Sequence, residues 1–143
     1  MARQIVFKFE KGGLLVAEVL PDIAPKTVES FIRMLPLQAT VYHSRWSGRE
    51  VNFPVKSKVR IPRENQTTQT NTGDVIYWKE WDMDDSEAAE AIALYYGAEV
   101  TRDHRGYLPV NVFARIQPDQ WKGIEEIGLR IWQNGIEKVT VTL

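Results

Sequence analysis

The segment from His43 to Trp46 holds the side chains of this 143-residue chain that are best suited to chemistry. Arg45 supplies a positive charge and Trp46 a flat apolar surface, so the two could hold a planar or anionic ligand. The alternative is a purely structural turn in which the Arg45 guanidinium stacks on the Trp46 ring. The residues themselves leave both interpretations open.

A second group of charged residues, 102–105, lies in a segment predicted to be a loop, residues 98–108. The simplest interpretation of this group, which includes His104, is a solvated surface loop. The alternative is that Arg102 or Arg105 reaches over a binding site and holds an anion.

Aromatic residues are frequent in this chain, and most of them are expected in the core. Trp46, Trp81 and Tyr107 lie beside predicted loops and are better placed to line a groove. The residues predicted to bind a ligand are His43, Arg45, Trp46, Trp78, Tyr95, Arg102 and His104.

Composition and motifs argue against several classes of function. The chain has no cysteine, so disulfides and thiolate chemistry are excluded. Its two histidines are far apart in sequence and no converging ligand spacing is visible, so we predict no metal site. Motifs for phosphate loops, dinucleotides, serine hydrolases and zinc proteases are missing, so we predict no cofactor.

The charge and hydropathy of the chain predict an ordinary globular protein. A net charge of −1 gives no reason to expect nucleic acid or acidic membranes as partners. No apolar run approaches transmembrane length, and the first apolar run is interrupted by charges. We therefore expect a cytoplasmic protein with no membrane contact, and the length fits a single domain over residues 1–143.

The elements that must position these side chains begin with two strands and a helix. Alternating apolar residues predict strands over residues 5–9 and 14–20, joined by a turn with two glycines. Pro25 opens a helix predicted over residues 25–35, because the first turn of a helix does not need its N–H. Phe31 lies at the centre of the apolar stripe of this helix and is predicted to be a core residue.

Further strands are predicted along the middle of the chain, over residues 37–43, 51–55 and 73–78. The polar segment 56–71 is predicted to be a mobile loop or an exposed hairpin. Helix-forming residues predict a short helical turn over residues 86–91, followed by a strand through Tyr96.

The last part of the chain is predicted as strand, helix and strand. In residues 110–116, strict alternation would place Val110, Val112, Ala114 and Ile116 on one face. A second helix is predicted over residues 118–133, and a closing strand over residues 138–143.

Three stretches of the sequence resemble the cyclophilins. Residues 24–31, APKTVESF, are similar to the PKTxENF helix of that family, and residues 111–116, NVFARI, are similar to its VFGxV strand. Residues 137–143 resemble its closing strand. The resemblance implies a mainly β (α+β) fold: a closed antiparallel cyclophilin-like β-barrel with two capping helices.

A second resemblance runs through most of the chain. The segments HSRWSGREVNFP, GDVIYW, ALYYG and LPVNVFARI are similar to the prokaryotic DUF3830 proteins, a cyclophilin-like family of uncharacterised function. This resemblance implies a cyclophilin-like fold and leaves the activity undefined.

The cyclophilin resemblance also implies a site for prolyl isomerisation, in which an arginine assists rotation about the amide bond. Arg45 follows the similar Tyr42–His43 pair one residue late, which in a strand would point it to the opposite face. Tyr77 and Trp78 are expected to fill the proline pocket. We therefore predict a non-catalytic module that binds a small molecule or a peptide in the barrel-face groove.

Two alternatives to this binding module remain open. The first is a peptidyl-prolyl isomerase that uses Arg45, and the second is a structural or oligomerisation domain that forms a homo-oligomer.

Overall fold

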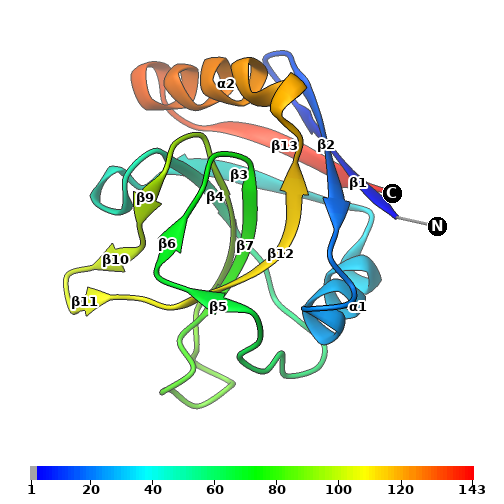
Figure 1. Ribbon diagram of the computed structural model, residues 1–143, viewed down its shortest axis with the longest axis vertical. Coiled ribbons are helices and arrows are strands. Elements are labelled where there is room, and N and C mark those ends of the chain that lie inside the picture. The colour runs from blue at the N-terminus through cyan, green and yellow to red at the C-terminus, as the bar shows by residue number, and fades with distance from the viewer. Residues whose placement is uncertain (1–2) are drawn as a thin grey trace.

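The chain folds into a closed antiparallel β-barrel, as seen in a computed structural model that describes residues 3–143 (Figure 1). Its eight strands follow the order β2-β1-β13-β3-β4-β8-β7-β12, and β12 pairs back with β2. The barrel strands are β1 (Gln4–Phe9), β2 (Leu14–Val19), β3 (Leu37–His43), β4 (Glu50–Pro54), β7 (Asp74–Lys79), β8 (Glu90–Tyr95), β12 (Val110–Ile116) and β13 (Glu137–Thr142). The predicted fold class is confirmed.

Short elements complete the structure. They are β5 (Gln66–Thr67), β6 (Gln69–Thr70), β9 (Glu99–Val100), β10 (Arg102–Asp103), β11 (Gly106–Tyr107) and the 3-10 turns η1 (Arg45–Ser47) and η2 (Pro118–Gln120). Two helices, α1 (Pro25–Met34) and α2 (Trp121–Asn134), lie near opposite ends of the barrel in Figure 1. Both fall where the sequence predicts them, except that the second begins as a 3-10 turn.

The inside of the barrel is filled by the apolar residues that alternate along each strand. In β1, Ile5, Phe7 and Phe9 are buried, whereas Gln4 and Lys8 between and before them are exposed. This alternation follows from the pleat, which points successive side chains to opposite faces of a sheet. Burial of this inner set is the main favourable contribution to folding.

The helices close the core through small contact regions. Phe31 of α1 is fully buried, and its ring meets that of Phe113 edge-on with centroids 5.3 Å apart. On α2, Gly128 faces the ring of Tyr96 so closely that a Cβ atom there would overlap the ring. A glycine in mid-helix costs stability in general, but here it lets α2 approach the barrel.

A β-bulge in β12 overturns the strict alternation predicted for this strand. The register with β7 shifts between Val112 and Ala114, so Phe113 is an extra residue. Val110 and Val112 consequently pack in a cluster on the outer face, whereas Ala114 and Ile116 belong to the inner core. The bulge is the physical reason for the error, because an inserted residue reverses the faces on one side of it.

The helical turn predicted over residues 86–91 is shorter and earlier than expected. The backbone N–H groups of Glu87 and Ala88 both donate to the Asp84 carbonyl, which makes a single turn. The chain is already a strand at Glu90, because pairing of β8 with β4 and β7 outweighs helix propensity there.

The polar segment 56–71 is tied to the barrel and does not form an exposed hairpin. Its strands β5 and β6 pair with β12 and β9 and not with each other. Asn111 of β12 is fully buried and holds the segment: its Oδ1 accepts from Glu64 N at 3.0 Å, and its Nδ2 donates to Pro62 O at 2.9 Å. The same Nδ2 donates to Thr27 Oγ1 of α1 at 3.1 Å. Within residues 3–143, no helix is long and apolar enough to cross a membrane.

Replacing Phe31 with alanine tests whether the contact between α1 and the barrel supports the fold. We expect Phe31→Ala to lower the free energy of unfolding by ~3–5 kcal/mol, because it opens a cavity beside Phe113. Denaturant titration measures this change. The control is Leu14→Ala at a side chain that is 56% exposed, where we expect less than about 1 kcal/mol. Equal losses in both variants would contradict this account of the core.

Candidate functional site

A pocket of about 260 Å³ lies on the outer face of the barrel, over strands β4, β8, β7 and β12. Its floor is apolar and includes Ile76, Ala93 and Val110. Trp46 of η1 and Trp78 of β7 line its sides. A pocket that combines apolar walls with a few polar groups is the usual form of a small-molecule site.

The pocket exists because a small residue lies at the centre of its floor. Ala93 is flanked by Asn52 of β4 on one side and Ile76 of β7 on the other, as the strand registers show. Its methyl group leaves space that a larger side chain would fill. Two elements surround this space. The hairpin of β10 and β11 contributes Arg102 and Asp103 to the lining, and the turn η1 contributes Trp46.

Glu50 is the buried acid of this pocket. Its side chain lines the cavity although the residue is only 7% exposed. Its Oε1 accepts a hydrogen bond from the Tyr95 hydroxyl at 3.1 Å, and its Oε2 accepts one from Asn52 Nδ2 at 2.9 Å. Each carboxylate oxygen has a second lone pair, so the group retains capacity to accept further donors.

Burial raises the pKa of Glu50 from 4.5 to about 7, because the charged form loses its hydration. Hydrogen bonds from Tyr95, Asn52 and Ser47 favour the charged form and oppose part of this shift. The pKa of Tyr95 is also raised, first by burial and then by the nearby Glu50 charge, so its hydroxyl stays neutral and donates. A carboxyl group that changes protonation near neutral pH in a pocket is typical of functional sites.

Local backbone structure fixes Glu50 in place. The turn η1 ends at Gly48, whose φ of 98° favours glycine, and the chain then enters β4 at Glu50. Ser47 at the end of the turn meets the Tyr95 hydroxyl at 3.2 Å, and its Oγ accepts from Arg102 N at 3.3 Å. The turn, β8 and β10 are therefore linked around the acid.

Four residues of the predicted ligand-binding set come together here, and three do not. Trp46, Trp78, Tyr95 and Arg102 line the pocket. His104 lies outside it and lines an adjacent, more open hollow that shares Trp46 and Arg102.

His43 and Arg45 lie beside α2, away from the pocket. The His43 ring lies 4.9 Å from that of Trp132, and its Nε2 is 2.6 Å from the Tyr96 hydroxyl. The Arg45 guanidinium lies over the Trp132 ring, 5.5 Å from its centroid. The structural interpretation of Arg45 stacking on Trp46 is thus incorrect, because α2 offers Arg45 another ring.

The surroundings of His43 keep it neutral. Burial, and then the charge of Arg45, lower its pKa from 6.5 to about 4. Its Nδ1 is buried and has no hydrogen-bond partner among the described residues. At neutral pH His43 is therefore an uncharged packing residue.

The other aromatic residues singled out in the sequence divide between core and surface. Tyr77 is fully buried on the inner face of β7, where its hydroxyl donates to Glu90 Oε1 at 2.6 Å, so it does not fill the outer pocket. Trp81 and Tyr107 line a second hollow of about 230 Å³, and the Arg63 guanidinium lies 4.8 Å from the Trp81 ring centroid.

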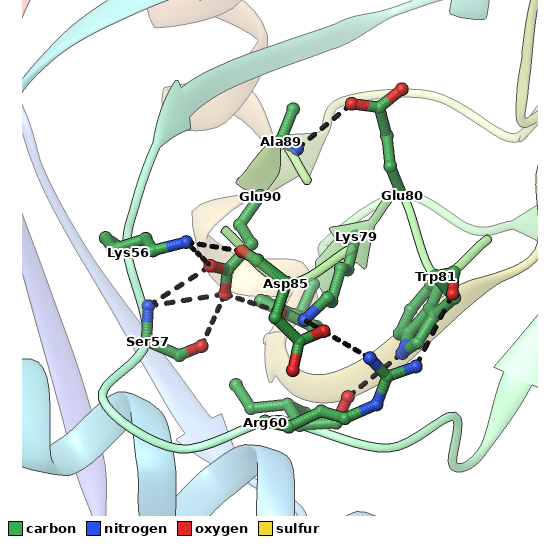
Figure 2. A network of polar contacts seen from close by, with 11 residues as sticks. Lys56, Ser57, Arg60, Lys79, Glu80, Trp81, Asp85, Ala89 and Glu90 are labelled. Carbon is green, nitrogen blue, oxygen red and sulfur yellow. Dashed lines mark hydrogen bonds and ion pairs between the residues drawn. The ribbon is translucent and has the colours of Figure 1, made fainter. Parts of the chain in front are cut away.

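Glu90 anchors a separate polar network at the start of β8 (Figure 2). Its carboxylate accepts from Ser57 Oγ at 2.6 Å and lies 3.7 Å from Lys56 Nζ. Lys79, which is also buried, donates to Asp85 Oδ1 at 2.8 Å, as Figure 2 shows. Every charge here has a partner, so the network fastens the loops to the barrel and offers no free group.

Sequence reasoning missed Glu50 and Asn52, which give the pocket its polar character. Both lie in the segment REVNFP, where they occupy alternate positions of a strand. That spacing was the available signal, since it places an acid and an amide on one face. Within residues 3–143, no three histidine or acidic side chains are grouped to hold a metal ion.

Comparison with known proteins places the chain in a family. A family model described as "Protein of unknown function (DUF3830)" matches residues 9–143. Among curated proteins, no match is found.

Solved structures with similar folds come from distant proteins. McbB, solved in complex with tryptophan, has a TM-score of 0.73 at 17% identity; the match covers 97% of this chain but only 44% of McbB. The hypothetical protein AF2241 of Archaeoglobus fulgidus has a TM-score of 0.62 at 24% identity, with 99% and 94% covered. A Mimivirus cyclophilin has a TM-score of 0.57 at 10% identity, with 99% and 86% covered. These likenesses establish the cyclophilin-like fold.

The raised pKa of Glu50 predicts a stability that depends on pH. Because the folded protein binds this proton more tightly than the unfolded chain, ionising Glu50 destabilises the fold as pH rises from 4.5 through about 7. Ionisation of Glu50 lowers the free energy of unfolding by ~3 kcal/mol at most. Glu50→Gln removes it, so the variant should gain stability relative to the parent between about pH 5 and about pH 8.

Denaturant titration at each pH measures the difference in the free energy of unfolding between Glu50→Gln and the parent. Other titrating groups such as His43 contribute equally to both proteins, so their effects cancel in this difference. The control is Glu126→Gln at an exposed carboxylate of α2, for which we expect no such trend. A difference that stays constant with pH would show that Glu50 is ionised freely in the folded protein.

Proposed function

We propose that this chain, which belongs to the DUF3830 family of proteins of unknown function, binds a small molecule in its pocket. The observation that carries the proposal is the pocket itself, a preformed space of about 260 Å³ with an apolar floor and Glu50 in its wall. Drug-sized ligands occupy pockets of ~300–1,000 Å³, so the expected ligand is smaller than these.

The lining of the pocket supports a ligand with a flat apolar part. Trp78 and Ile76 of β7 line the cavity, together with Leu108 and with Val110 of the neighbouring strand β12. Aromatic side chains bind flat groups well, because they offer large apolar surfaces with preferred stacking geometries. McbB, of which the match covers 44%, was solved in complex with tryptophan, a small aromatic molecule.

The position of Arg45 favours binding over prolyl isomerisation. Its guanidinium lies over Trp132 of α2 and does not line the pocket. An isomerase of the cyclophilin type needs an arginine held against the prolyl group, within a fraction of an ångström of its working position. The pocket offers Arg102 at its rim, where the side chain is exposed and Nε is bonded to Trp46 O at 3.0 Å.

Filling the pocket tests the proposal directly. We expect Ala93→Leu to weaken binding of small-molecule hits by at least about tenfold, because its larger side chain occupies the floor of the cavity. Hits come from a thermal-shift screen of metabolites, and the change in the tryptophan fluorescence of the protein, to which Trp46 and Trp78 of the pocket contribute, reports their affinity. The control is Ala89→Leu, at an exposed position outside the pocket. Equal affinity in all three proteins would contradict the proposed site.

An isomerase assay tests the alternative function. We expect wild type and Arg45→Ala to leave a proline-containing model peptide near its uncatalysed rate, which corresponds to tens to hundreds of seconds. The physical reason is the distance of Arg45 from the pocket. Strong acceleration by wild type that disappears in Arg45→Ala would restore the isomerase interpretation.

A further inference from the structure

Buried carboxylates in this protein are normally paired with a cation. The described residues hold four of them: Glu50, Asp74, Glu90 and Glu137. The Asp74 carboxylate lies 3.3 Å from Arg115 Nε, Glu90 lies 3.7 Å from Lys56 Nζ, and Glu137 lies 2.8 Å from Arg130 Nε. Such pairing is expected, since removing a charge from water is costly unless an opposite charge compensates it.

Glu50 is the exception among residues 3–143. No lysine, arginine or histidine nitrogen lies within 4.0 Å of its carboxylate. Its partners are neutral groups: the Tyr95 hydroxyl, the Asn52 amide and the Ser47 hydroxyl. Of the four buried carboxylates, Glu50 is also the one that lines the pocket. A cationic group of a bound ligand would therefore be able to reach it.

We propose that the ligand of this pocket carries a protonated amine that pairs with Glu50, and an apolar or aromatic body that lies against Ile76, Trp78 and Val110. This inference rests on the proposed function. The ligand class is therefore a small organic amine. Its ammonium group would donate to the free lone pairs of the carboxylate, an interaction that is strong because donor and acceptor are both charged.

Among the charged residues that line the cavity, Glu50 is the carboxylate without a cationic partner in the described part of the chain. Besides Glu50, the charged lining residues are Arg102 and Asp103 of β10, and the Asp103 carboxylate is already paired with Arg105 at 2.6 Å. Arg102 is exposed and its charge is screened by water. The pKa of Asp103 is lowered, first by its hydrogen bond from Arg105, so it stays ionised at neutral pH.

Protonation of Glu50 then controls binding. The titratable and polar groups that face it are Tyr95 from β8, which stays neutral, Asn52 from β4 and Ser47 from η1. Alkylamines remain cationic well above neutral pH. Glu50 is therefore the group whose ionisation sets the pH dependence, and amine affinity should rise as pH increases through about 7.

Three probes that share one ring and differ in charge test the inference: phenethylamine, phenethyl alcohol and phenylacetate. Tryptophan fluorescence and calorimetry give their affinities for the purified full chain at about pH 8. We expect the amine to bind about tenfold or more tightly than the alcohol, and phenylacetate to bind weakest. In wild type this preference should shrink as pH falls to about 5.

Glu50→Gln should remove both the preference for the amine and its pH dependence, while Glu126→Gln on the exposed face of α2 should retain them. A general loss of fold would lower the affinity of all three probes alike, so the ratio between amine and alcohol isolates the charge. If Glu50→Gln does not fold, the wild-type pH profile and the amine-to-alcohol ratio still decide.

Two failures are distinguishable. If the three probes bind wild type equally and Ala93→Leu weakens all of them, the pocket is a binding site but the requirement for an amine is overturned. If none of the probes binds wild type at millimolar concentration, the proposed aromatic small-molecule site fails and the amine inference fails with it.

Discussion

The double pairing of β12, with β7 on one side and β2 on the other, is the constraint on which the rest of the structure depends. It closes the sheet, so that no barrel strand keeps an unpaired edge, and it defines an inside and an outside. The inside becomes the core, to which α1 is attached through Phe31 and Phe113. The buried amide of Asn111, in the same strand, then fastens the segment 56–71 to the barrel.

Closure also places the core and the pocket on opposite faces of the same strands. The inner faces of β4, β7 and β8 hold the core, whereas their outer faces carry the pocket, covered by η1 and the hairpin of β10 and β11. The outer face therefore tolerates features that a core would not, such as the space above Ala93 and the buried carboxyl group of Glu50, which has no cationic partner within 4.0 Å among residues 3–143. Proteins commonly accept such local costs where they bind a ligand.

The fold was predictable from the sequence, and the site was predictable only in part. Periodicity located α1, α2 and the first strands, because their apolar residues repeat at regular intervals. The bulge at Phe113 was not visible, since an extra residue leaves no mark on composition. Trp46, Trp78, Tyr95 and Arg102, which the sequence singles out, line one pocket, and their role in binding stays a prediction. Glu50 was not singled out, because its burial without a cationic partner depends on tertiary structure.

The bulge in β12 also determines which changes in length this strand can absorb. Losing a residue from a paired strand normally shifts every following side chain to the opposite face. Here Phe113 is the supernumerary position between Val112 and Ala114, so its deletion would leave regular alternation with Val112 outside and Ala114 inside. Both faces would keep their side chains, and the losses would be the Phe113 ring in the core, with its contact to Phe31, and the hydrogen bond from Leu20 N to Phe113 O at 2.8 Å. A descendant of this chain could therefore shorten β12 at this one point and keep the face that carries the pocket.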